Sequence, residues 1–157
     1  MGAFISNPLS AYGQDADATP HAQAVVKEFR SAAALSIGQI VKLVKTTATV
    51  GGNTVDVLNV DVATANTDVA IGVVVKGSTG AGESVQVCTH GPAKVQSSGT
   101  SVAAGTWFQP TTSGRAADAA VGTVGTRTAV GITLEATGTT AGDLKFVYVN
   151  PSMIFAS

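Results

Sequence analysis

The segment Val69-Ala-Ile-Gly-Val-Val-Val-Lys76 decides the fold, because the chain repeats it as Thr128-Ala-Val-Gly-Ile-Thr-Leu-Glu135. Each copy leads through a short Ala-Gly turn into a second apolar run that ends near a proline. These second runs are Val85-Gln-Val-Cys88, before Gly91-Pro92, and Leu144-Lys-Phe-Val-Tyr-Val149, before Asn150-Pro151. Gly72 and Gly131 lie 59 residues apart, and so do the two prolines. No acidic, basic or metal-ligating residue is identical in the two copies, which indicates a duplicated scaffold.

Alternation of apolar and polar residues predicts strands in the rest of the chain. It is clear from Ile40 onward and again over Thr54–Val62, where a slip near Leu58-Asn59 predicts a β-bulge. Residues 23–30 fit either a helical turn or a strand, and we favour the strand. The run Val102–Pro110 is a fainter copy of Leu35–Leu43, because in both a small-residue turn with one glycine precedes an apolar strand.

These patterns predict an all-β fold, a small barrel or sandwich built from a pseudo-duplicated β unit. The pseudo-repeats cover about residues 35–92 and 102–151, inside a single β domain of residues 23–151. We expect the Gly-, Ala- and Thr-rich stretch 111–126 to be a long loop between strands.

An extended N-terminal arm, residues 1–22, precedes the domain, and a short apolar tail, residues 152–157, follows it. Prolines and glycine interrupt the arm, so it cannot form a long regular element. It nevertheless carries apolar side chains, which indicate a segment that docks on another surface. The candidate contact residues of the arm are Phe4, Ile5, Leu9 and Tyr12.

The composition restricts the partners. Only 12% of the residues are charged, about half of the usual share of roughly 25%, and the net charge is −1. Lysines and arginines are scattered, so direct nucleic-acid binding is not expected. No apolar run reaches the roughly 18 residues of a membrane span. A surface so poor in charge indicates that much of it is covered in an assembly.

The sequence offers little for catalysis, and we expect neither an enzyme nor a cofactor or metal site. The two histidines are His21 and His90, and neither Gly-x-Ser-x-Gly nor His-Glu-x-x-His occurs. A Ser/His/Asp set remains open, because its members meet in space and not in sequence. Cys88 and His90 alone give too few ligands for zinc. The glycine-rich run 77–82 leads into a strand and therefore predicts a hairpin connection.

The adjacent aromatic residues Trp107 and Phe108 are candidates for an oligomer interface, together with Phe155 near the end of the chain. Neighbouring residues of a strand face opposite ways, so one ring can fill the core while the other meets a partner. The alternative, that both rings belong to the core, stays open.

The repeats and their linkers resemble the capsid cement, or head decoration, proteins of tailed bacteriophages. The resemblance covers roughly Ala24 to Val149, and the length of the arm and the Thr-rich stretch 111–126 depart from it. It rests on several short motifs, namely Val69-Ala-Ile-Gly-Val, Ala81-Gly-Glu-Ser-Val-Gln-Val, Gly91-Pro-Ala-Lys-Val, Val102-Ala-Ala-Gly-Thr, Thr112-Ser-Gly-Arg-Ala and Thr128-Ala-Val-Gly-Ile-Thr-Leu-Glu-Ala.

The resemblance implies a structural virion protein that stabilises an expanded icosahedral capsid by bridging capsomers. Its implied partners are the major capsid protein and its own copies, as a homotrimer. It implies a location on the outer capsid surface, and in the host cytoplasm before assembly. The alternative is a β-rich fibre or adhesin module that binds a surface ligand. A nucleotide hydrolase of the deoxyuridine triphosphatase type is disfavoured, because neither Tyr12 nor Tyr148 lies in the required motif.

Overall fold

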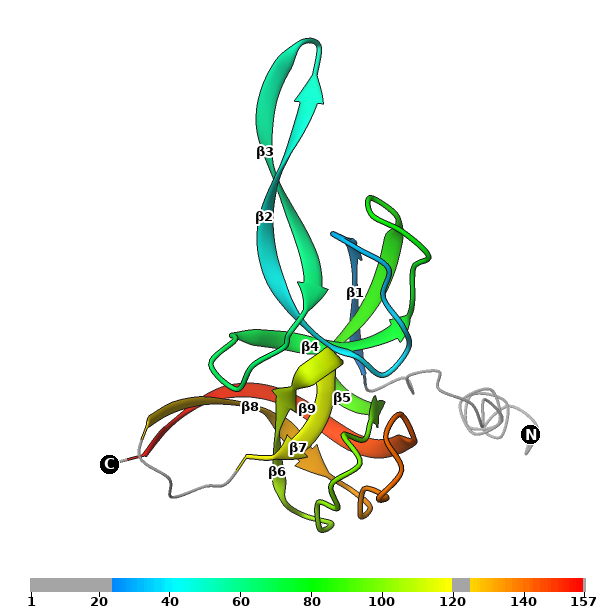
Figure 1. The fold of residues 1–157 in the computed structure, drawn as a ribbon, viewed down its shortest axis with the longest axis vertical. Coiled ribbons are helices and arrows are strands. Elements are labelled where there is room, and N and C mark those ends of the chain that lie inside the picture. Colours follow the sequence, from blue (N-terminus) through cyan, green and yellow to red (C-terminus); the bar gives the residue numbers. More distant parts are fainter. Residues whose placement is uncertain (1–23, 120–124, 157) are drawn as a thin grey trace, which may run out of the picture.

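The computed structural model describes residues 24–119 and 125–156, and within them the regular elements are β-strands and one 3₁₀ turn. The strands belong to one open antiparallel sheet in the order β3-β2-β4-β5-β9-β8-β6-β7, with β1 paired to β5 (Figure 1). The elements are β1 Val25–Arg30, β2 Ile40–Val50, β3 Asn53–Val62, β4 Ala70–Lys76, β5 Ser84–Gln96, β6 Trp107–Thr111, η1 Thr112–Gly114, β7 Arg115–Asp118, β8 Gly125–Thr133 and β9 Leu144–Ala156. The all-β prediction is confirmed.

Several local predictions need correction. The pairing of β2 with β3 is continuous from Val41 to Val50, so the bulge expected near Leu58-Asn59 is absent from this pair. Part of the stretch 111–126, expected to be a loop, forms the tight β6–β7 hairpin. The C-terminal segment is not a separate tail, since β9 runs through Pro151 to Ala156 and pairs with β8.

The sheet consists of two similar halves that share β5. We call β1 to β4 and β5 up to His90 the first half, and β5 from Gly91 onward with β6 to β9 the second half. In the first half, Val26 of β1 pairs with Cys88 of β5. In the second, Pro92 of β5 pairs with Tyr148 of β9. The far part of β5 therefore takes the place in the second half that β1 takes in the first.

The turns of the two halves are held by equivalent serines, Ser31 and Ser97, both fully buried. The Ser31 amide donates to the Glu83 carbonyl at 2.9 Å, and the Ser97 amide donates to the Asp143 carbonyl at 2.8 Å. The Ser31 hydroxyl donates to the carbonyl of Gly80 at 2.6 Å. Ser97 makes the same bond to a carbonyl in the second hairpin loop, that of Gly138, at 2.8 Å. Each serine also forms an isolated parallel bridge to the edge strand of its own half, Ser31 to β3 and Ser97 to β7. These bridges bend each half of the sheet onto itself.

The repeated glycines of the sequence sit where two backbones cross closely. Gly72 pairs with Val41 of β2, and Gly131 pairs with Phe108 of β6. A Cβ atom on Gly72 would overlap the carbonyl oxygen of Cys88, and one on Gly131 would overlap that of Tyr148. Only a residue without a side chain permits this approach.

The apolar core has two parts. One fills the first half alone and is made of Leu35, Val41, Val60, Val74, Val85 and Val87. The other joins residues of both halves and is made of Ile40, Ala63, Ala70, Val73, Cys88, Ala93, Val95, Phe108, Ala116, Val130, Val147 and Val149. The two halves thus pack together through a continuous buried cluster.

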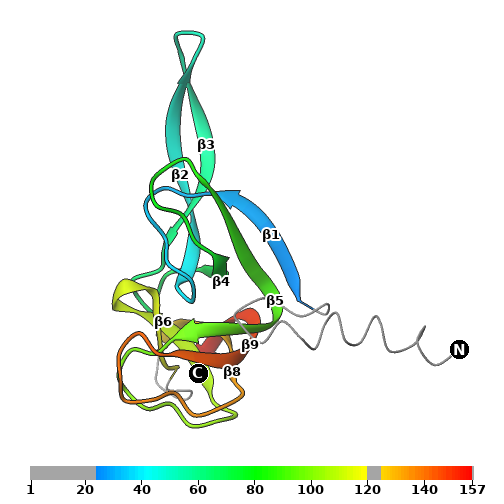
Figure 2. The ribbon, with the colours of Figure 1, turned by 90° about the vertical axis from the view of Figure 1, so that its right-hand side faces the viewer.

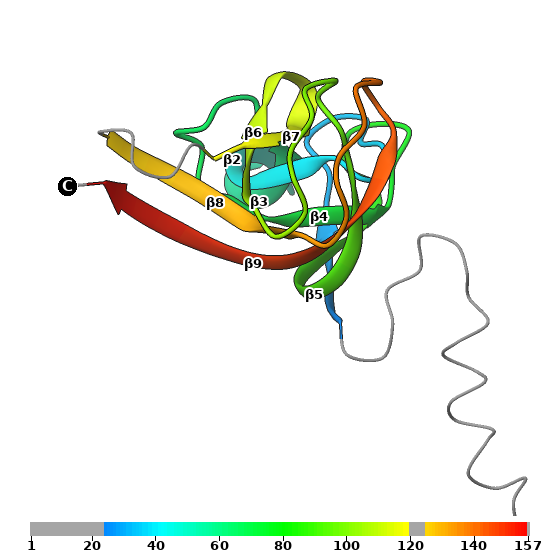
Figure 3. The ribbon, with the colours of Figure 1, turned by 90° about the horizontal axis from the view of Figure 1, so that it is seen from below.

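The overall shape is a compact body with a long projection. β2 and β3 extend beyond the rest of the sheet as a two-stranded ribbon (Figure 1). β1 and the near part of β5 run beside the base of this ribbon (Figure 2). β8 and β9 form a curved ribbon whose far end points away from β5 (Figure 3).

Candidate interaction surfaces

Cys88 is buried, and the His90 ring contacts Tyr148. Burial of the Cys88 thiol raises its pKa to about 11, so the thiolate is disfavoured at neutral pH. His90 Nε2 lies 3.1 Å from the Tyr148 hydroxyl, and the two rings meet edge to face. Within the described residues, no three His, Cys, Asp or Glu side chains gather as a metal site would require. His21 lies outside the described residues.

The Glu83 carboxylate at the end of the glycine-rich loop binds groups within that loop. Residues 77–82 connect β4 to β5, as predicted for a hairpin. The Glu83 carboxylate accepts hydrogen bonds from the Thr79 amide at 2.7 Å and the Thr79 hydroxyl at 2.8 Å. These bonds lower the pKa of Glu83. A carboxylate held against the loop amide opposes the binding of a phosphate there.

The β2–β3 ribbon, which is only two strands wide, exposes apolar side chains. Val50 and Leu58 are each 62% exposed, and Leu43 and Val55 are also exposed. Gly51 and Gly52 both have positive φ and close the ribbon with a two-residue turn. An isolated two-stranded hairpin is marginally stable in water. An apolar ribbon of this kind therefore favours contact with a partner.

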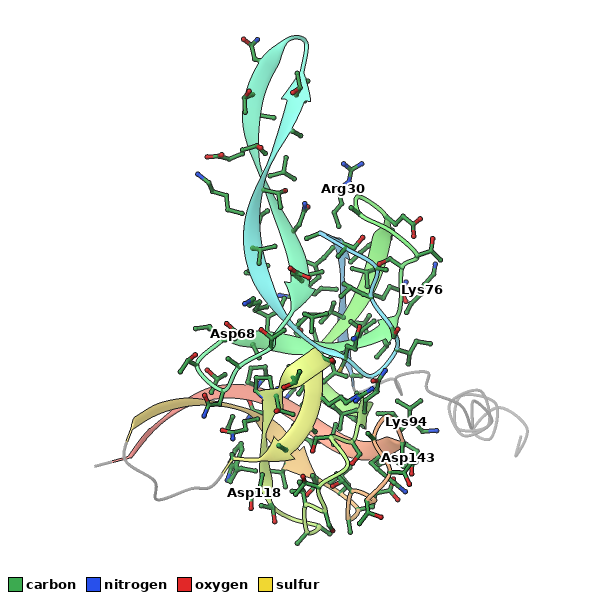
Figure 4. All side chains as sticks on the ribbon, in the orientation of Figure 1. Arg30, Asp68, Lys76, Lys94, Asp118 and Asp143 are labelled. Atoms are coloured by element: carbon green, nitrogen blue, oxygen red, sulfur yellow. The ribbon has the colours of Figure 1, made fainter. Side chains whose placement is uncertain are left out.

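A groove of about 330 Å³ separates the base of the ribbon from the end of β1. Arg30 flanks it on the side opposite the ribbon (Figure 4). Asn59, which is 8% exposed, lines it and donates through Nδ2 to the Thr46 hydroxyl at 2.7 Å. The Asn59 Oδ1 atom is buried without a hydrogen-bond partner. A buried acceptor that lacks a donor costs about 1–3 kcal/mol of stability.

A second apolar surface covers the outer side of the second half, and we call it the aromatic face. Lys94 Nζ lies 4.8 Å from the centre of the Phe146 ring, a cation–π contact. Tyr148 is 40% exposed. Cross-strand pairing places these side chains on one side of the sheet. The face consists of Pro92, Lys94, Trp107, Ile132, Leu134, Leu144, Phe146 and Tyr148.

The structure separates the residues expected at an oligomer interface. Phe108 is fully buried in the core shared by the two halves, so it has no surface left for a partner. Trp107 is half-buried and belongs to the aromatic face. Phe155 lies in the far part of β9, where its backbone pairs with Thr126. The arm candidates Phe4, Ile5, Leu9 and Tyr12 lie outside the described residues.

The sequence interpretation missed both the ribbon and the aromatic face. The available signal for the face was the i, i+2 spacing of Leu144, Phe146 and Tyr148, which places them on one side of a strand. For the ribbon, the Gly51-Gly52 pair marked the turn, but nothing marked the absence of a covering element.

No protein-family model and no curated protein matches the chain. Among residues 24–119 and 125–156, no helix is long and apolar enough to cross a membrane.

Proposed function

We propose that this chain is a structural protein that attaches to a larger protein shell, as the resemblance to phage head decoration proteins implies. Its partners under this proposal are the major capsid protein and further copies of the chain. The β2–β3 ribbon carries the proposal, because it projects from the body and exposes Val50, Val55 and Leu58.

The ribbon suits attachment to a protein surface in two ways. Its exposed apolar side chains gain free energy when a partner covers them, at about 25 cal/mol per Å² of apolar area. In addition, β3 is an edge strand of the sheet, and its outer side is bridged only at Val60 within the described residues. An extended segment of a capsid subunit can pair with the rest of that edge, as in strand addition.

Weak individual contacts suffice for this role. A decoration protein that touches several subunits of a shell gains avidity through effective concentration. The low charge of the chain agrees with many copies sitting close together, because like-charge repulsion between neighbours stays small. The apolar candidates of the arm, Phe4, Ile5, Leu9 and Tyr12, are proposed as a further contact with the shell.

Co-sedimentation with expanded, empty phage heads that lack their decoration protein tests the proposal. We expect wild type to sediment with the heads, and Val50→Asp with Leu58→Asp to abolish binding while the fold is retained. Because both side chains are largely exposed, the substitutions remove a contact and leave the core unchanged. Thr100→Asp, at an exposed site in the loop before β6, is the matched control.

The fibre or adhesin alternative draws on a different surface. Exposed aromatic rings such as Phe146 and Tyr148 suit stacking on a sugar ring. Retention on a glycan array that is lost in Tyr148→Ser, with no binding to heads, would favour the adhesin and contradict the capsid proposal.

A further inference from the structure

We infer that the aromatic face binds the first half of a second copy of this chain, in the way that the two halves already bind each other within one copy. This contact deepens the self-association part of the proposed function and rests on it. It uses surfaces separate from the exposed tip of the ribbon.

The two halves contain equivalent rows of side chains. In the first half, cross-strand pairing aligns Ile40 of β2, Val73 of β4 and Cys88 of β5. In the second half, the same pairing aligns their counterparts, which are Trp107 of β6, Ile132 of β8 and Tyr148 of β9.

The two rows differ in burial. Ile40, Val73 and Cys88 are each 0% exposed, because the second half covers them. The side-chain Nε2 of Gln39, next to this row, donates to the Ser113 carbonyl of the second half at 3.0 Å. Their counterparts stay partly open, and Tyr148 is 40% exposed. The row of the first half forms an interface inside the chain, whereas the row of the second half is apolar and partly open.

The complementary surface is also present twice. In the second half, Ala93, Val95, Val130 and Val149 are buried in the cluster that is shared with the first half. Pro110 of β6 and Ala129 of β8 are also buried. Their counterparts in the first half are Lys27, Phe29, Leu43, Ala70, Ile71 and Thr89. Of these only Ala70 is buried, and all six line an open groove of about 540 Å³ together with Asn150 and Pro151 of β9. The groove therefore occupies the position of a filled interface.

The sizes of the side chains agree with this pairing. Trp107 and Tyr148 are larger than Ile40 and Cys88, and the groove that would receive them is open. Buried aromatic residues supply much of the binding free energy at protein interfaces. The contact is heterologous, since the second half of one copy meets the first half of the next. Repetition of it either closes a ring or extends a chain of copies.

Two single variants and their mixture test the inference by sedimentation velocity, without heads. Tyr148→Asp places a carboxylate in the aromatic face, and Leu43→Asp places one in the groove. Both native side chains are about 40% exposed. Each variant alone is expected to weaken self-association by more than about a hundredfold, because a carboxylate would be buried in an apolar contact. Thr100→Asp, in the loop before β6 and outside both surfaces, is the control that keeps wild-type association.

The mixture separates a head-to-tail contact from a symmetric one. Each variant keeps one intact surface, so the mixed variants are expected to form a dimer that grows no further. A monomeric wild type, an unchanged mass in either variant, or a mixture that stays monomeric would overturn the inference. Thermal unfolding of each variant confirms folding, and Tyr148→Ser and Leu43→Lys replace any variant that fails. Co-sedimentation with heads is scored separately, so loss of self-association is distinguished from loss of capsid binding.

Discussion

Substitution of Gly131 by alanine tests the close crossing of strands that defines each half. The new Cβ atom would overlap the carbonyl oxygen of Tyr148 on the neighbouring strand β9. A carbon and a carbonyl oxygen normally approach to about 3.3 Å, so one backbone must move. Overpacking of this kind costs about 1–3 kcal/mol, and a backbone obstacle places the cost at the upper end. Alanine regains about 0.5–1 kcal/mol of strand propensity.

The expected net loss in the free energy of unfolding is therefore about 2 kcal/mol, or a fall in Tm of about 4–8 °C for a chain of this length. Gly72→Ala should cost a similar amount, because its Cβ would meet the Cys88 carbonyl in the same way. Gly80→Ala is the control, since the nearest atom to its Cβ is Glu83 Oε1 at 3.8 Å. It should stabilise by about 0.4–1 kcal/mol. Urea unfolding measures all three, and a Gly131→Ala midpoint equal to that of wild type would refute the crossing.

Three further predictions concern stability. Ser31→Ala and Ser97→Ala should each lower the free energy of unfolding by about 1–3 kcal/mol, because each leaves a loop carbonyl without its donor; a loss in only one of them would argue against equivalent halves. Burial opposes ionisation of Asp68, but hydrogen bonds from Lys42 and two backbone amides outweigh it and lower the pKa of Asp68. A carboxyl group whose pKa is lower in the folded than in the unfolded chain stabilises the fold at pH values above the unfolded pKa. Asp68→Asn should therefore cost about 1 kcal/mol at pH 7. This difference should disappear as the pH falls through the pKa of Asp68 in the folded state. Burial raises the pKa of the Cys88 thiol to about 11, so the contribution of this thiol to stability should be constant well below pH 9. Stability should decline as the pH rises from about 9 towards about 11, and Cys88→Ala should reduce that decline. In the folded state this thiol should resist a thiol reagent at pH 8, and rapid labelling would contradict its burial.

The sequence predicts the hairpins well, because glycine and proline punctuate them at fixed places. The Ala-Gly turns of the two copies correspond to Gly82 and Gly142, which both have positive φ. Val102–Pro110 and Leu35–Leu43 also share local geometry. Gly38 and Gly105, for example, both have positive φ and donate to equivalent carbonyls in β4 and β8.

The equivalence of β1 with the far part of β5 could not be predicted. Their aligned residues differ in chemistry, since Lys27 corresponds to Ala93 and Glu28 to Lys94. Proline normally ends a strand or lies at an edge or bulge. Pro92 is accommodated inside β5 because it lies where that strand changes partners from β1 and β4 to β9.

The candidate surfaces could not be predicted from the sequence either, and the reason is physical. Alternation tells which residues share a side of a strand, but not whether another element covers that side. The rows of Ile40 and Trp107 have similar apolar patterns, yet one is buried by the second half and the other is open. Only the packing of the halves separates an internal contact from a free one.

Calorimetry of expanded heads, with and without a saturating amount of this protein, tests the central claim most directly. A protein that works by bridging shell subunits should raise the temperature at which the heads rupture, and its own unfolding temperature should rise when it is bound. Heads that rupture at the same temperature with and without it, while the free protein unfolds unchanged, would contradict a role in holding a shell together.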